Sequence, residues 1–150
     1  MTESGYGLGE SLIETLVKTV TGFTAVNVAR ANWKPLNRGK AATYAIVYPA
    51  DFARRVGRQQ VTETFVTRVE IWQRYKDDGT TAIDLYAAAD AVLRKIEAYP
   101  HLGDTSGYVV DSEPTLSLPE EMWTRGGGPA WLRQVINVRW TGQRIRTFLD

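Results

Sequence analysis

The chain has 150 residues, of which 43% are apolar and 23% are charged, as expected for one globular domain with a sizeable core. Its 18 Lys and Arg residues nearly balance its 17 Asp and Glu residues, so it lacks the basic excess of a dedicated nucleic-acid-binding protein. It has no Cys, no apolar run of about 18 residues and no secretory signal, which excludes disulfide scaffolds, thiolate catalysis and membrane spans. We therefore expect assembly in the cytoplasm and no contact with a membrane.

The first third of the chain is predicted to contain one helix and a polar loop. Residues 1–9 are rich in Gly, and we expect them to be flexible. Apolar residues recur every three or four positions over residues 10–21, which predicts a helix that ends at Gly22. We expect a short strand within residues 24–33 and a polar loop over residues 32–40.

The middle of the chain is predicted to hold two strands joined by a connector. Residues 44–48 have the composition of a strand, and Pro49 is expected to stop it because proline lacks a backbone donor. Residues 50–60 are rich in Arg and Gln and are interpreted as the connector. Residues 61–75 alternate strictly, which predicts a long strand with one buried face and one wetter face.

A turn and a strongly patterned helix follow the long strand. Residues 77–79, Asp-Asp-Gly, break the alternation, and Thr81 with Asp84 three residues later predicts a capping box. The helix is expected over residues 82–98, where one apolar stripe suits a helix that lies across a sheet. The stripe consists of Ala82, Leu85, Tyr86, Ala89, Val92, Leu93 and Ile96.

The last third of the chain is predicted to be mostly extended. Tyr99-Pro100 ends the helix because a residue before proline disfavours helical dihedrals. We expect a short strand at residues 108–111 and an extended stretch along a surface or a sheet edge at residues 114–119. Glu120 and Glu121 follow Pro119 and suggest a short helical turn. Residues 131–141 alternate cleanly and predict the final strand.

These elements predict a single α+β domain over residues 1–150, without internal repeats. We expect a mixed, mostly antiparallel sheet flanked by an N-terminal helix and by the long helix near residues 82–98.

The sequence does not predict a reaction centre. His101 is the only His, and Ser106 does not lie in the G-x-S-x-G pattern of a nucleophile elbow. The glycines at positions 5, 7 and 9 have no strand before them, as a phosphate-binding loop would require. The pairs of adjacent carboxylates lack a third residue at a spacing that would complete a metal-binding site. We therefore predict no catalytic, cofactor-binding or metal-binding residue, and a protein that is not an enzyme.

Basic and aromatic residues in the loops are candidates for contacts with a partner. Such charges often only solvate a surface, but they can also contact an acidic protein or a DNA backbone. Tryptophan in polar surroundings is typical of interface hot spots. The candidates are Trp33, Lys34, Arg38, Lys40, Arg54, Arg55, Arg58, Trp123 and Arg125.

The order of the elements resembles that of the tail terminator proteins of long-tailed bacteriophages, also called tail completion or minor tail proteins. The resemblance lies in the N-terminal helix, the loop around Trp33, the long strand 61–75, the helix 82–98 and the final strand 131–140. It implies a hexameric ring that caps the tail tube, ends tail polymerisation and joins the head connector. DNA would pass through this ring without sequence-specific binding. The resemblance supplies no site residues.

The same resemblance implies a place in the virion, at the head-proximal end of the tail, after assembly in the host cytoplasm. Two alternatives stay open. A head–tail connector or adaptor protein of the phage neck would also form a ring, but of twelve rather than six subunits. A small cytoplasmic α+β enzyme or ligand-binding domain would instead present a concave pocket with converging polar groups.

Overall fold

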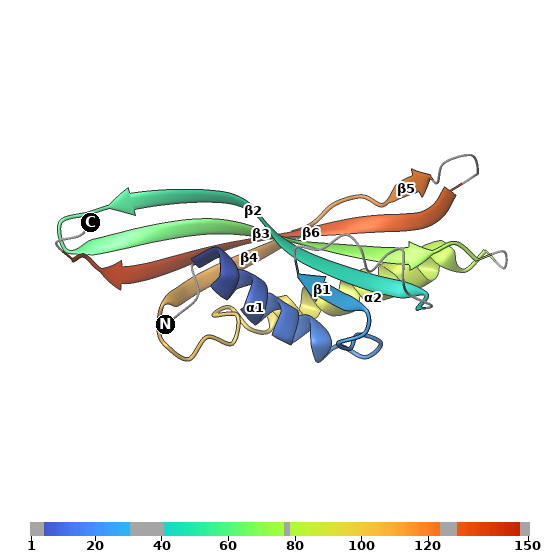
Figure 1. Cartoon of the computed structure of the whole chain (residues 1–150), viewed down its shortest axis with the longest axis horizontal. Coiled ribbons are helices and arrows are strands. Elements are labelled where there is room, and N and C mark those ends of the chain that lie inside the picture. Colours follow the sequence, from blue (N-terminus) through green and yellow to red (C-terminus); the bar gives the residue numbers. More distant parts are fainter. Residues whose placement is uncertain (1–4, 31–40, 77–78, 124–128, 148–150) are drawn as a thin grey trace.

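The computed structural model describes residues 5–30, 41–76, 79–123 and 129–147, and these residues form a single α+β domain, as predicted. Each of the two described helices precedes three strands, and all these strands belong to one sheet (Figure 1). They are α1 (Gly5–Lys18), β1 (Val28–Arg30), β2 (Thr43–Val56), β3 (Gln60–Arg74), α2 (Thr81–Glu97), β4 (Val109–Leu116), β5 (Glu120–Trp123) and β6 (Pro129–Ile145).

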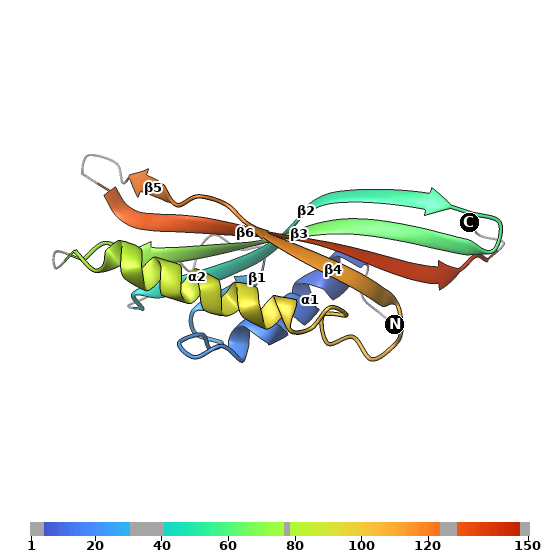
Figure 2. The same ribbon diagram turned by 180° about the vertical axis from the view of Figure 1, so that it is seen from behind.

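The sheet is mixed and mostly antiparallel, which confirms the prediction. Its strand order is β1-β2-β3-β6-β4, and β5 pairs with the start of β6. Only β1 and β2 run parallel among the described pairs. Both helices lie on the same side of the sheet, as Figures 1 and 2 show from opposite directions. We call this side the helix face and the other side the opposite face.

The core lies between the helices and the helix face. Alternate residues of β3 and β6 point into it, and Val69 of β3 is paired with Ile136 of β6. Both side chains are fully buried, as are Ile13 of α1 and Leu85 of α2. Burial of one such aliphatic side chain stabilises the fold by about 1.5–3 kcal/mol. The alternation predicted for both strands is therefore confirmed on this face.

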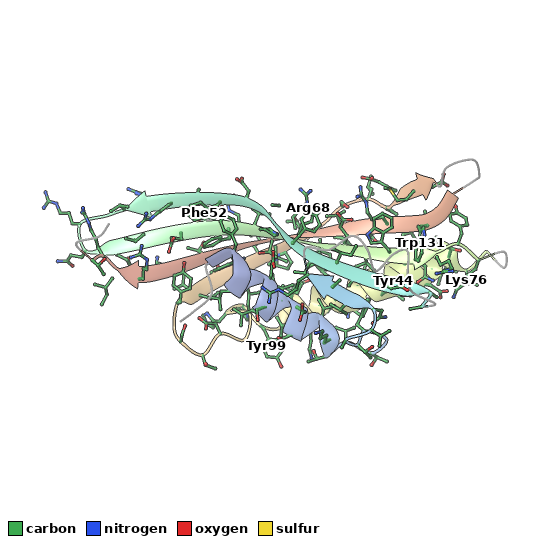
Figure 3. All side chains as sticks on the ribbon, in the orientation of Figure 1. Tyr44, Phe52, Arg68, Lys76, Tyr99 and Trp131 are labelled. Carbon is green, nitrogen blue, oxygen red and sulfur yellow. The ribbon has the colours of Figure 1, made fainter. Side chains whose placement is uncertain are left out.

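Part of the opposite face is buried rather than exposed to solvent. The prediction that the long strand has one wetter face is wrong there. Tyr44, Ile46 and Trp72 form a second apolar cluster on this face, and each is at most 6% exposed. The ring of Tyr44 meets that of Trp131 edge-on, with the centroids 5.7 Å apart (Figure 3). The end of β3 is consequently buried on both faces, while its start follows the predicted pattern.

Pro49 does not stop β2, contrary to the prediction, because it lies at the edge of the sheet. β1 pairs with β2 only at residues 45–47, so no described strand needs a donor from Pro49. A bulge between Pro49 and Asp51 absorbs the irregularity, and β2 continues to Val56. The expected connector at residues 50–60 is therefore mostly strand, and it forms a long hairpin with β3.

The N-terminal helix begins earlier than predicted, at Gly5, so residues 5–9 are helical rather than flexible. Residues 1–4 lie outside the described residues. The glycines allow close packing: a Cβ on Gly5 would lie 2.2 Å from the ring of Phe65, and one on Gly9 would lie 2.6 Å from that of Trp140. The missing side chains let α1 approach the sheet.

The C-terminal end of α2 agrees with the prediction, but its N-terminal end does not. α2 ends at Glu97, as Tyr99-Pro100 predicted, but its N-cap is Thr80, which makes no capping side-chain bond. Thr81 instead accepts a hydrogen bond from the backbone of Lys76 at 2.8 Å, so the predicted capping box is wrong.

One Tyr and a pair of Glu residues also differ from their predicted environments. Tyr86, placed on the apolar stripe of α2, is 49% exposed. Glu120 and Glu121 belong to β5 rather than to a helical turn, because β6 continues far enough to pair with them. The final strand is confirmed and extends to Ile145.

We expect Gly9→Ala to destabilise the protein by about 1–3 kcal/mol, because its Cβ would overlap the Trp140 indole. Alanine normally stabilises a helix interior relative to glycine by about 0.5–1 kcal/mol, so the sign of the effect is diagnostic. Urea denaturation measures it, with Ser11→Ala in the same helix as the control. A Gly9→Ala protein at least as stable as the wild type would contradict this packing.

Candidate functional site

The most distinctive surface of the molecule is a projecting three-stranded arm. We define the arm as residues 50–66 of the β2–β3 hairpin and residues 139–146, mostly of β6. Its outer part extends beyond both helices, to the left in Figure 1. Residues 50–60 are all exposed, although Phe52 contacts Tyr6 of α1 and Val61 of β3 is buried. Strand residues that remain exposed contribute little to a core, which makes the tip a candidate for contact with a partner.

An aromatic cluster holds the base of the arm to α1. Phe65 of β3 stacks on Trp140 of β6, with ring centroids 4.3 Å apart. Phe52 of β2 lies 5.0 Å from Phe65, and Tyr6 of α1 lies 5.4 Å from both Phe52 and Phe65. Aromatic pairs of this geometry contribute about 0.5–1.5 kcal/mol each beyond their buried area. The arm is therefore fixed to the body of the domain and not a loose hairpin.

The arm is basic, whereas the rest of the chain is acidic. The arm carries six Arg residues and only two carboxylates, Asp51 and Glu63. The whole chain has a net charge of +1, so the remaining residues have a net negative charge. The nearly neutral net charge of the whole chain conceals this asymmetry. The six residues are Arg54, Arg55, Arg58, Arg139, Arg144 and Arg146.

One of the two carboxylates of the arm is used internally. Glu63 lies 3.4 Å from the guanidinium of Arg144 and accepts a 2.8 Å hydrogen bond from the Tyr108 hydroxyl. Burial, together with this bond to a carboxylate, raises the pKa of Tyr108 above its ordinary value. Tyr108 therefore stays protonated and ties the segment before β4 to the arm.

The structure brings together one group of the predicted contact residues. Arg54 and Arg55 lie on β2 and Arg58 in the hairpin turn, where Arg144 and Arg146 join them because Gln60 pairs with Ile145. Trp123 belongs to β5, but its side chain is not described. The other candidates lie outside the described residues: Trp33, Lys34, Arg38, Lys40 and Arg125.

Two open hollows lie at the arm tip. One is lined by Arg55, Arg58 and Thr62, and the other by Arg58, Ile145 and Arg146. Both are shallow, solvent-facing depressions rather than enclosed cavities. Their chemistry suits contact with an anionic surface better than enclosure of a small molecule.

Two edges of the sheet have no partner strand among the described residues. On one side, β1 pairs with β2 only at residues 45–47, so no described strand pairs with the outer side of β2 beyond Val47. On the other side, β4 pairs with β6 alone. Unpaired edges offer rows of backbone donors and acceptors to another strand.

The edge strand β4 lies in an acidic part of the chain that the sequence reasoning missed. Residues 96–124 contain six carboxylates and no Lys or Arg, a signal that is visible in the sequence. Two of these carboxylates, Asp111 and Glu113, are exposed on β4. Neither makes an ion pair with another described residue. One edge of the sheet is therefore acidic and the other belongs to a basic arm.

The other charged cluster is internal. Glu70 of β3 is 1% exposed on the opposite face and accepts hydrogen bonds from the Tyr48 hydroxyl and, at 3.0 Å, from the Trp72 indole. Arg133 approaches it at 3.4 Å and pairs with exposed Glu120 at 2.7 Å. Burial opposes the charge of Arg133, but the bond to Glu120 and the charge of Glu70 raise its pKa overall. The carboxylate is enclosed by donors, which is typical of a structural network.

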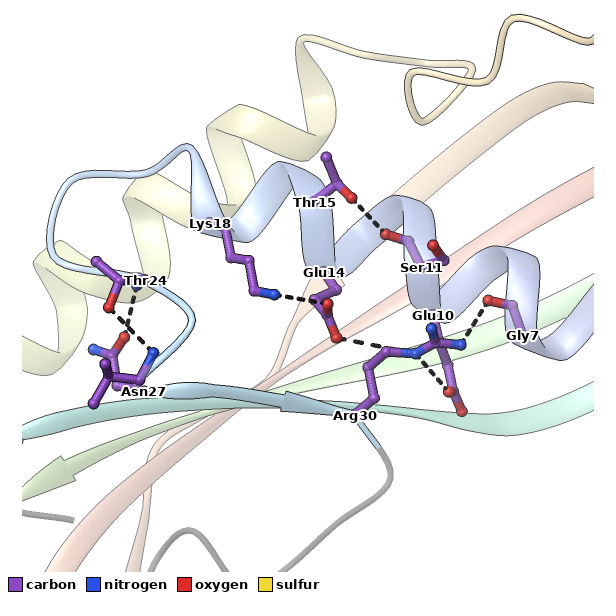
Figure 4. A network of polar contacts seen from close by, with 10 residues as sticks. Gly7, Glu10, Ser11, Glu14, Thr15, Lys18, Thr24, Asn27 and Arg30 are labelled. Carbon is purple, nitrogen blue, oxygen red and sulfur yellow. Dashed lines mark hydrogen bonds and ion pairs between the residues drawn. The ribbon is translucent and has the colours of Figure 1, made fainter. Parts of the chain in front are cut away.

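Arg30 lies at the end of β1, where it serves to dock α1 onto this strand (Figure 4). Its guanidinium lies 3.2 Å from the Glu10 carboxylate and donates a 3.0 Å hydrogen bond to the carbonyl of Gly7. Glu14, which lies 4.0 Å from Arg30, also pairs with Lys18 at 2.8 Å. This network is therefore part of the scaffold.

The turn after α2 does not form a nucleophilic arrangement. The imidazole of His101 lies 3.1 Å from the carbonyl of Val109, and the Ser106 hydroxyl donates to Asp104 rather than to His101. Asp104 also accepts bonds from the backbone of Ser106 and Val109. Burial acts to raise the pKa of Asp104, but these bonds outweigh it and the pKa is lowered.

Within the described ranges, no three His, Cys, Asp or Glu residues are placed to hold a metal ion. Among the described helices, none is long and apolar enough to cross a membrane. A scan against protein-family models found no match, and no curated protein matches the chain.

We expect Glu70→Ala to destabilise the protein by about 3 kcal/mol, because it leaves buried donors and part of the Arg133 charge without a partner. Glu120→Ala is the matched control: it removes the second carboxylate of the same Arg133, but Glu120 is 57% exposed. Its effect should stay within about 1 kcal/mol. Urea denaturation compares the two, and equal losses would contradict the structural role of Glu70.

We expect Asp104→Asn to be less stable than the wild type near neutral pH. Because the folded state lowers the pKa of Asp104, its contribution is complete above the unfolded value of about 3.9 and is lost as the pH falls through the lower folded value. The difference between the two proteins should therefore shrink below about pH 4. Urea midpoints measured from neutral pH downward test this, and a pH-independent difference would contradict it.

Proposed function

We propose that this protein is a ring-forming structural subunit of a long-tailed bacteriophage, the tail terminator. In this role a hexameric ring of the chain caps the finished tail tube, stops its polymerisation and joins it to the head connector. DNA passes through the ring without sequence-specific contacts, and the ring lies at the head-proximal end of the tail. The resemblance in element order suggests this role.

The observation that carries the proposal is a sheet with two edge strands, β2 and β4, whose outer sides pair with no described strand apart from residues 45–47 of β2. A subunit that closes into a ring uses one heterologous interface, so it needs two different complementary surfaces on opposite sides. β2 and β4 provide two such surfaces on opposite sides of one sheet. The basic arm and the acidic remainder of the chain favour head-to-tail contact over contact between identical patches.

The arm also provides a second kind of surface, for stacking on another ring. Its tip extends beyond the helices, and its residues 50–60 are exposed. A ring that docks onto a tube needs such a surface in addition to the one between its own subunits. Arg58 and Arg146, at the end of the arm, would meet carboxylates of the tail tube or of the connector.

We expect native mass spectrometry of the purified chain, alone or mixed with a tail tube protein, to show a hexamer. Negative-stain electron micrographs of the same sample should show rings. A ring of twelve subunits would favour the head–tail connector alternative. A monomer that binds neither tube nor connector protein would overturn the proposal and favour the enzyme or ligand-binding alternative.

We expect the triple substitution Arg54→Glu, Arg55→Glu and Arg58→Glu to leave the fold intact but to abolish assembly. The fold should survive because all three side chains are exposed, whereas the arm changes from basic to acidic. Circular dichroism and native mass spectrometry measure the two properties. Arg94→Glu with Lys95→Glu on α2 serves as the control for charge reversal away from the arm, and unaltered assembly of the triple variant would remove the arm tip from the interface.

A further inference from the structure

We infer that the subunits join by sheet extension: the outer edge of β2 in one copy pairs antiparallel with the outer edge of β4 in the next copy. In this pairing Arg55 lies opposite Asp111 of the neighbour, and Ala53 lies opposite Glu113. The inference rests on the proposed ring function and goes beyond it by naming the two edges and their register. The partner is a second copy of this chain.

The two edge strands lie at the same position along the strand direction. A second copy can therefore be added beside the first without a large shift in that direction. Reading across the sheet, Phe52 of β2 pairs with Phe65 of β3, which pairs with Trp140 of β6 and then with Ser112 of β4. The edge strands are therefore the two ends of one continuous four-stranded row. A neighbouring copy that continues this row meets β4 with its own β2.

The strand directions also agree with such an extension. β2, β3, β6 and β4 alternate in direction, because each neighbouring pair is antiparallel. β4 therefore runs opposite to β2. A β2 strand added beside β4 continues the alternation, and an antiparallel ladder forms between copies. Repetition of this step produces a closed ring of sheets if the rotation closes.

Two prolines mark out the parts of the edges that can pair. Pro49 lies just beyond the segment of β2 that β1 covers, and Pro114 lies within β4. Neither can donate a backbone hydrogen bond, and proline on an edge strand discourages further pairing. The segment between Pro49 and the hairpin turn and the segment from Val109 to Pro114 are of similar length. These two segments are left available to each other.

The charges select the register. A shift by an odd number of residues would bring side chains of different faces together, so only even shifts keep the faces continuous. With no shift, Asp51 would lie opposite Glu113 of the neighbour, which is unfavourable. A shift by two residues places Arg55 opposite Asp111 and diagonal to Glu113. A sheet that closes into a barrel requires a stagger of this kind.

The helix face gains an apolar contact in the same register. Phe52 is 37% exposed although its other side packs on Phe65. The ladder ends at Pro114 of the neighbour, which lies opposite Phe52 but cannot donate a hydrogen bond to its carbonyl, and Leu116, which is 40% exposed, lies on the diagonal. The exposed part of Phe52 is therefore covered when two copies pair. Charge lies on one face of the new ladder and apolar contact on the other.

Disulfide trapping tests the register directly, because the chain contains no Cys and every disulfide must be engineered. In the inferred ladder Ala53 and Glu113 form a non-hydrogen-bonded pair with Cα atoms about 4.5 Å apart, within the range that a disulfide spans. We expect the Ala53→Cys, Glu113→Cys double variant to form covalent multimers up to the ring size under oxidation. The control pairs Ala53→Cys with Ala87→Cys, which lies on the exposed side of α2 and should not cross-link.

Charge exchange tests the same contact without a covalent bond. Arg55→Asp or Asp111→Arg alone places like charges opposite each other at every interface, and each should weaken assembly by about tenfold. The variant that carries both changes should assemble within about threefold of the wild type. Asp90→Arg on α2, at an exposed ion pair with Arg94, is the control and should assemble normally. Sedimentation velocity over a range of concentrations measures all four.

The possible results separate this inference from the proposed function. Rings without the specific cross-link and without rescue by the double charge exchange would overturn the edge pairing and leave the ring subunit in place. Cross-linked multimers that bind neither tube nor connector protein would support the edge pairing and overturn the phage role. A chain that stays monomeric and uncross-linked, with and without tube protein, would overturn both.

Discussion

The antiparallel pairing of β3 with β6 is the constraint on which the rest of this structure depends. The pairing runs over the whole of β3, from Gln60 to Arg74, which at about 3.4 Å per residue corresponds to about 50 Å. α1 and α2 have 14 and 17 residues, and at 1.5 Å per residue they are only about 21 and 25 Å long. Helices of this length cannot cover such strands. The projecting arm follows from this difference.

The aromatic cluster determines where the covered part of the sheet ends. Phe65 and Trp140 stack across β3 and β6, and the close approach of α1 through Gly5 and Gly9 closes the core at this level. Beyond it, residues 53–60 are exposed, although Val61 of β3 is still buried. A bare sheet with unpaired edges is an aggregation hazard unless its pairing is controlled. Prolines on both edges and opposite charges on the two sides are such controls, and the proposed head-to-tail arrangement of copies would use the same features.

Local periodicity predicted most of the scaffold, because each periodic segment matches a face that is buried in the fold. The helix near residues 82–98 and the alternating strands 61–75 and 131–141 are confirmed for this reason. The predictions failed where contacts between residues distant in the sequence outweighed a local sequence pattern. Pro49 stops a central strand but not an edge strand, and Glu120 starts a helix only if no partner strand pairs with it. The glycines near the N-terminus indicated flexibility, whereas tertiary packing uses them for contact.

The sequence by itself determined the α+β class, the two helices, the long strands and the presence of basic clusters, since these depend on residues that are neighbours along the chain. Only the tertiary structure decided that Arg54 and Arg55 lie on an exposed strand together with arginines from the other end of the chain. It alone decided which strands form the edges, and hence that the acidic strand β4 lies across the sheet from the basic part of β2. Strand order depends on pairings between distant residues, and a sequence pattern contains no record of which strand remains without a neighbour.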